Sequence, residues 1–141
     1  MNKYEALRNR QSNEFNTLPM KAAFGEEQFN NMMAEWGLSS SQEDIKKIRS
    51  LGVGAYCLAT DVQKFVDMGK KHMKETEEFL KTDEGLKEAL MYEFSNQECG
   101  YTGNYEDAIT ALDFDVREFI TDEHKLGIFE ETKKEYQSKY E

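Results

Sequence analysis

The stretch EFSNQECGYTGNYED, residues 93–107, concentrates the residue types of this chain that can do chemistry. Its carboxylates, amides and Cys99 leave three alternatives: a calcium loop, a reactive thiol, or a connector between two helices. An EF-hand loop needs glycine at its sixth position and glutamate at its twelfth, but a count from Asn96 places Tyr101 and Asp107 there. No histidine is close to Cys99 in the sequence, and its acidic neighbours disfavour a thiolate. The residue types therefore favour a connector between two helices.

No other segment completes a catalytic, metal or nucleotide motif. The two cysteines and two histidines lack zinc-ligand spacing, and His72 fits the surface of a helix. Gly52 and Gly54 precede a short apolar run without completing a Walker or dinucleotide loop, so they predict a bend leading into a strand. Neither a nucleophile–histidine arrangement with supporting context nor HExxH is present. We expect no metal, no cofactor and no enzymatic activity.

Hydrophobic periodicity predicts the elements that position this stretch. The pattern indicates an α+β fold that is mostly helical, with about six helices around one core. A small two-stranded sheet is expected from residues near 20–24 and 54–59. Further expectations are a capping box at Thr60 and Gln63, a loop at CGYTG, Asn104 as a helix N-cap and Ile120 facing inward. The length of 141 residues predicts a single domain, 1–141.

Charge is distributed unevenly along the chain, whose net charge is −10. Residues 1–60 carry seven basic and seven acidic side chains, whereas residues 75–131 carry four bases and seventeen acids. Such a field repels phosphate, so direct binding of nucleic acid is not expected. No apolar run approaches the roughly 18 residues of a membrane span, and the N-terminal residues lack the pattern of a secretory signal. These features predict a cytoplasmic protein without a membrane partner.

Exposed carboxylates of the acidic half are the candidate partner-binding residues. Carboxylates accept hydrogen bonds from arginine as phosphates do, so an acidic face can occupy a basic, nucleic-acid-binding cleft. The alternative is that these charges only solvate the surface. A second alternative is an adaptor or regulatory protein that binds its partner through an apolar patch, with Met32, Met33, Trp36, Tyr136 or Tyr140 as anchors. The predicted acidic face consists of Glu98, Glu106, Asp107, Asp113, Asp115, Glu118, Asp122 and Glu123.

Four segments of the chain resemble a family of small proteins carried by phages and plasmids of gut bacteria. These segments are LPMKAAFGEEQFNNMM, DIKKIRSLGVGAYCLATD, KKHMKE and MYEFSNQECGYTGNYEDAITALDFD, and the resemblance spans roughly residues 1–125. Its markers are a helix start with Phe24, Gln28 and Phe29, the glycine segment after Ile48, and Tyr101 to Gly103. The resemblance implies a role inside a bacterial host cell and no enzymatic activity.

The resemblance also extends to anti-CRISPR proteins that inhibit type II RNA-guided nucleases. Such a nuclease holds its guide–target heteroduplex in a positively charged channel, which matches the basic partner expected from the charge distribution. The chain departs from the pattern of these relatives at Gln97, Cys99, Asn104 and Asp113. Gln97 stands where relatives carry histidine, so a metal role is disfavoured while an interaction role is untouched.

Overall fold

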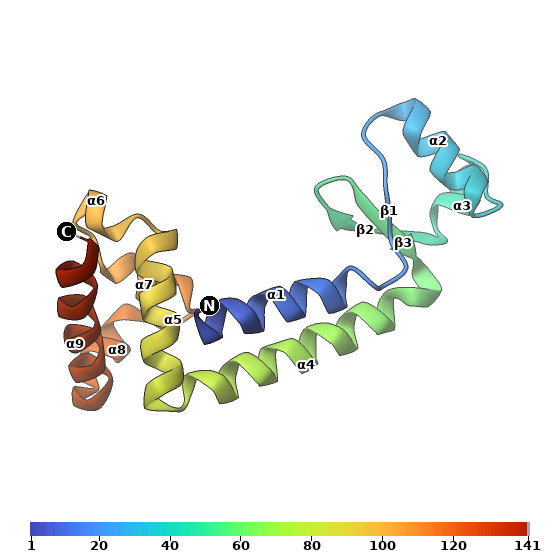
Figure 1. Cartoon of the computed structure of the whole chain (residues 1–141). Helices are drawn as coiled ribbons and strands as arrows, with labels where there is room; N and C mark the ends of the chain where they lie inside the picture. Colours follow the sequence, from blue (N-terminus) through green and yellow to red (C-terminus); the bar gives the residue numbers. More distant parts are fainter. Residues whose placement is uncertain (141) are drawn as a thin grey trace. The chain divides into compact units, whose positions relative to one another are not determined.

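The computed structural model describes residues 1–140 and has a mostly helical α+β fold, which confirms the predicted fold class (Figure 1). This part of the chain contains nine α-helices, one short 3-10 helix and three strands, more helices than the six expected. The elements are α1 (Lys3–Phe15), β1 (Lys21–Ala22), α2 (Glu26–Glu35), α3 (Gln42–Ile45), β2 (Ile48–Gly52), β3 (Ala55–Leu58), η1 (Ala59–Asp61), α4 (Val62–Leu80), α5 (Asp83–Asn96), α6 (Cys99–Thr102), α7 (Glu106–Ala111), α8 (Val116–Thr121) and α9 (Glu123–Tyr140).

The chain divides into two compact units. The helical unit comprises residues 1–10 and 73–141, and the sheet unit comprises residues 11–72. Helices α1 and α4 each contribute residues to both units. The expectation of a single domain stays a prediction. Among residues 1–140, no helix is both long and apolar enough to cross a membrane.

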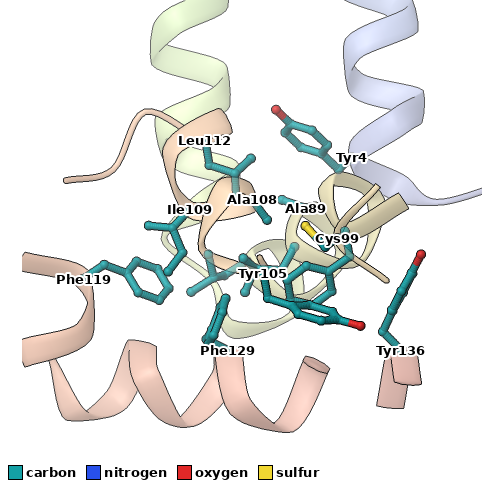
Figure 2. Close-up of a cluster of buried hydrophobic side chains, with 13 residues drawn as sticks. Tyr4, Ala89, Cys99, Tyr105, Ala108, Ile109, Leu112, Phe119, Phe129 and Tyr136 are labelled. Carbon is teal, nitrogen blue, oxygen red and sulfur yellow. The ribbon is translucent and has the colours of Figure 1, made fainter. Parts of the chain in front are cut away.

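An aromatic core holds the helical unit together. Helix α5 packs against α7 and α9, and its Phe94 is fully buried, with its ring centroid 5.1–5.7 Å from those of Tyr105, Phe129 and Tyr136. Figure 2 shows these last three rings in the buried cluster. Helix α5 begins where Thr82 Oγ1 accepts a hydrogen bond from the Gly85 amide, as an N-cap does. Thirteen buried residues form this core, and they fix the connections between α5 and α9 that carry most of the predicted acidic face.

A small antiparallel sheet and α2 form the core of the sheet unit. The strand order is β1-β3-β2, with Lys21 opposite Tyr56 and Arg49 opposite Cys57. The hairpin between β2 and β3 contains the glycine bend predicted at Gly52 and Gly54, with a register shift after Ser50. The core of this unit has four buried residues, Ala23, Met32, Met33 and Ile48.

The sheet has three strands, whereas two were expected, and β2 is the strand that was not predicted. Only Ile48 of this edge strand is buried, so its sequence lacks the alternation that marks a half-buried strand. The predicted CGYTG loop instead forms α6, whose four residues are too few to display a helical period. Helix α6 ends at Gly103, which has a φ of 78°.

Three local expectations in the helices were also wrong. A 3-10 turn, Ala59–Asp61, precedes α4, and the Gln63 side chain donates to Asp67 at 2.8 Å instead of closing a capping box at Thr60. Tyr105 rather than Asn104 occupies the N-cap position of α7. In α8 the neighbouring ring of Phe119 is buried while Ile120 is 38% exposed, because the helix begins at Val116, after its N-cap Asp115, and turns Phe119 toward the core.

Candidate functional site

All eight residues of the predicted acidic face are exposed, and most lie where a helix begins. Glu106 and Asp107 occupy the first turn of α7, while Asp122 and Glu123 precede and begin α9. Acidic side chains are favourable there because the helix dipole places positive charge at the N-terminus. Local helix stability therefore accounts for part of this charge pattern.

Two of these carboxylates also cap helices directly. Asp115 Oδ1 accepts a hydrogen bond from the Glu118 amide of α8 at 3.0 Å, and Asp122 Oδ1 accepts one from the Lys125 amide of α9 at 3.1 Å. Each cap satisfies an amide that the helix leaves without a partner. These two acids therefore have a structural role that is independent of any partner.

None of the eight carboxylates forms an ion pair with another residue of the part that the structure describes. Acids elsewhere in the helical unit are paired, as Glu75 is with Arg10 at 2.7 Å and Glu135 with Lys87 at 2.6 Å. Nearby lysines lie over aromatic rings instead: Lys125 is 4.9 Å from the Phe114 centroid. The negative charge of the region is therefore not neutralised within the described chain.

The eight residues do not converge on one pocket. Asp107 lines a hollow of about 390 Å³ together with residues of α1 and α5. Glu98 lines a second hollow with three tyrosines. Asp113 lies in the α7–α8 connection with a φ of 63°. The eight carboxylates thus form a dispersed acidic surface.

Glu93 is a buried charge that the sequence reasoning missed. Its side chain is 1% exposed and lines the Asp107 hollow, where Oε1 lies 3.9 Å from Arg8 Nη1. Oε2 accepts hydrogen bonds from Gln97 Nε2 at 2.9 Å and Asn96 Nδ2 at 3.3 Å. Both amides therefore direct nitrogen toward Glu93 and leave their carbonyl oxygens for other donors. A signal was available, since Glu93 follows Leu86 by seven residues on the apolar stripe of α5.

Both cysteines are buried free thiols. Burial, followed by the nearby charge of Asp107, raises the pKa of the Cys99 thiol. Burial and Asp61 raise the pKa of the Cys57 thiol in the same direction. Protonated, inaccessible thiols are poor nucleophiles, so neither cysteine suits covalent chemistry.

Most of the apolar side chains considered as anchors for an adaptor role are buried in the two cores. Met32 and Met33 are buried in the sheet unit, and Tyr136 is 7% exposed in the helical unit. Different apolar residues are exposed around the β2–β3 turn: Phe24 is 66% exposed and Val53 96%. The Phe24 ring lies against Gly54 so closely that a Cβ at Gly54 would clash with it.

Comparison with models of protein families gives a match over nearly the whole chain. A model described as a family of unknown function (DUF7659) matches residues 3–135, nearly the whole chain and both of its units. The chain belongs to this family. No curated protein and no solved structure matches it. The DUF7659 match therefore places the chain among relatives without attaching an activity.

Proposed function

We propose that this protein is a non-enzymatic inhibitor that docks its acidic surface on a basic, nucleic-acid-binding protein of a bacterial host cell. The observation that carries the proposal is the set of eight exposed carboxylates without an ion pair in the described chain. The helical unit holds 20 acidic and 11 basic residues, a net charge of −9, whereas the sheet unit has −1. A cationic cleft would supply the missing counter-charges and would be steered toward this unit.

The target class we propose is the type II RNA-guided nuclease. This choice is supported by the resemblance described from the sequence and by the positively charged channel of such nucleases. Arginines of that channel normally contact phosphates, and carboxylates can replace these contacts with charge-assisted hydrogen bonds. The protein would then act in the cytoplasm by occupying the nucleic-acid site, without chemistry of its own.

The proposal is tested by a DNA-cleavage assay with several purified type II nucleases and a stoichiometric excess of this protein. We expect inhibition that weakens as salt rises, because the Debye length falls from about 10 Å at 0.1 M to about 3 Å at 1 M. Unchanged cleavage by every nuclease would contradict this target, and salt-independent inhibition would contradict the acidic interface.

A charge-reversal pair with a matched control locates the interface. Glu106→Lys with Asp107→Lys reverses two acids in the first turn of α7, and Glu26→Lys with Glu27→Lys does the same in the first turn of α2 in the sheet unit. Both pairs incur the same helix-dipole penalty. We expect the α7 variant to weaken inhibition about tenfold or more and the α2 variant to leave it nearly unchanged. Circular dichroism checks that both variants fold.

A second candidate function is an adaptor that binds a protein through the β2–β3 turn. Its supporting observation is the exposure of Phe24 and Val53, two apolar side chains that a partner would bury. Binding of this kind survives high salt, because it depends on apolar area. A Val53→Asp variant should abolish it while leaving nuclease inhibition intact, so the two functions are separable by one substitution.

A further inference from the structure

A hollow of about 660 Å³ in the helical unit has three tyrosines among its six lining residues. It is formed by the end of α5, by α6 and by the C-terminal end of α9, which lie together in Figure 1. Among the described residues, no basic side chain lines it, and Glu98 is its only charged member. The lining residues are Ser95, Glu98, Gly100, Tyr101, Tyr136 and Tyr140.

One wall of this hollow is fixed by the core, whereas two of its rings face solvent. Tyr136 packs against Phe94 at 5.5 Å, and Figure 2 shows it at the edge of the aromatic cluster. The Tyr140 ring lies 4.8 Å from that of Tyr136 and is 63% exposed. Tyr101 is 93% exposed on α6. Exposed tyrosines beside a rigid one provide ring faces at low entropic cost, as in binding interfaces.

Glu98 adds a carboxylate held in an unfavourable backbone conformation. Its φ of 53° and ψ of 38° lie in the left-handed region, which glycine and asparagine adopt more readily. The side chain is exposed and has no ion pair within residues 1–140. Backbone strain retained at a pocket is consistent with a function for the strained residue. Stability alone would favour asparagine or glycine here.

Other aromatic rings of the helical unit already have a basic side chain of the same chain lying over them. Lys133 lies 4.9 Å from the Tyr105 centroid, Lys125 lies 4.9 Å from that of Phe114, and Arg8 lies 5.8 Å from that of Tyr4. In the described part of the chain, no cation lies over Tyr101, Tyr136 or Tyr140. The tyrosine hollow therefore offers ring faces and a carboxylate that no internal cation uses.

We propose that this hollow binds an arginine side chain of the basic partner, an inference that rests on the proposed function. The guanidinium would stack on the exposed tyrosines and pair with Glu98. Arginine suits the site better than lysine, because its planar group stacks on rings and binds a carboxylate through two hydrogen bonds. Glu98 would thus be a specific contact within the otherwise dispersed acidic surface.

The test uses short capped peptides that differ only in one side chain: arginine, lysine or citrulline. Citrulline has nearly the shape of arginine without its charge. Binding to the full chain is followed by NMR of the tyrosine rings. We expect saturable shifts at Tyr101, Tyr136 and Tyr140 with the arginine peptide, weaker shifts with lysine and none with citrulline. Equal shifts with citrulline, or shifts spread over the acidic surface without these rings, would overturn the assignment.

Two variants and one control separate the hollow from the general acidic field. Tyr101→Ala and Glu98→Asn should each weaken binding of the arginine peptide about two- to fivefold. Glu130→Gln removes the same charge from an exposed position of α9, outside both the hollow and the eight acids, and should leave the peptide affinity unchanged. Glu98→Asn should also keep or raise the melting temperature, which a purely structural role of Glu98 would not produce. Wild-type affinity in both hollow variants contradicts the proposal.

Failure of this inference is distinguishable from failure of the proposed function. If the arginine peptide saturates the hollow but no nuclease is inhibited, the site is supported and the proposed target is wrong. If nuclease inhibition is salt-sensitive but the peptide causes no shift at the three tyrosines, the acidic surface is supported and the arginine site is wrong.

Discussion

The helical unit and the sheet unit solve the problem of surface charge in different ways. The helical unit combines a net charge of −9 with a core of thirteen buried residues, whereas the sheet unit combines −1 with a core of four. Mutual repulsion of like charges destabilises a compact state, and burial of apolar surface offsets it. The larger core thus allows the helical unit to keep carboxylates unpaired, and such carboxylates are available to a partner.

In the sheet unit, a larger share of the acidic side chains than in the helical unit forms ion pairs or accepts hydrogen bonds. Asp44 accepts hydrogen bonds from the Ser39 amide and hydroxyl, each at 2.8 Å, and lies 3.0 Å from Lys47. Lys21 pairs with Glu35 at 2.8 Å across the unit. Phe24 and Val53 are the most exposed large apolar side chains of this unit. The two units therefore differ in their surface charge, since unpaired carboxylates are concentrated in the helical unit.

The largest expected effect comes from removing the centre of one core at a time. Phe94→Ala in the helical unit should lower the free energy of unfolding by about 3–5 kcal/mol, and Met33→Ala in the sheet unit by about 2–5 kcal/mol, because both side chains are fully buried. Trp36 is the only tryptophan and reports on the sheet unit, while circular dichroism reports mainly on helices.

These two probes also test the expectation of a single domain. If the chain unfolds cooperatively, Trp36 fluorescence and circular dichroism give one denaturation midpoint in each variant. If Phe94→Ala shifts only the dichroism midpoint, the two units unfold separately and the expectation is wrong.

Two glycines with nearly the same backbone conformation compare the units directly. Gly54 has a φ of 76° and lies against the Phe24 ring, whereas Gly103 has a φ of 78° and open space where an alanine methyl group would lie. Gly103→Ala should cost only the left-handed conformation, about 1–2 kcal/mol. Gly54→Ala should cost more, because Phe24 must also move. Urea denaturation measures both, and equal losses would show that the Phe24 contact adds no constraint.

The N-cap at Asp115 separates structural from binding roles within the acidic surface. Asp115→Ala removes both the cap and the charge and should lower stability by about 1 kcal/mol. Asp115→Asn keeps an acceptor for the Glu118 amide and should leave stability nearly unchanged. If Asp115 contributes to docking, both variants weaken inhibition equally in the cleavage assay. Loss of inhibition in the alanine variant alone would assign Asp115 a purely structural role.

Long periodic helices were predictable from the sequence, whereas short and edge elements were not. Leu86, Leu90 and Phe94 recur at the spacing of one helix face, which predicts α5, and all three are buried. Strand β2 was not predicted, because a single buried residue gives no periodic pattern. Helix α6 was not predicted, because its four residues complete barely one turn. Local patterns contain no information on which neighbours will cover an element.

The candidate site was also predictable only in part, because a local sequence pattern does not show which elements meet in the fold. Exposure of the eight acidic residues follows from their charge, and the structure confirms it. The two hollows depend on helices that meet only after folding, such as α6 and the end of α9 around Tyr101 and Tyr140. The buried Glu93 likewise lies 3.9 Å from Arg8, which is far away in the sequence.

The smallest expected effect is a pH dependence confined to the sheet unit. Hydrogen bonds from Ser39, with Lys47 nearby, lower the pKa of Asp44 from 3.8 to about 2. A carboxyl with a lowered folded pKa contributes stability that is present above its unfolded pKa and is lost as the pH falls through the folded value. The advantage of the wild type over Asp44→Asn should therefore be full at neutral pH and shrink between about pH 4 and pH 2. Trp36 fluorescence during urea denaturation at several pH values measures this difference. The wild type and the Asp44→Asn variant have all other carboxyl groups in common. A stability difference between them that stays constant down to pH 2 would therefore show that the charge of Asp44 does not stabilise the sheet unit.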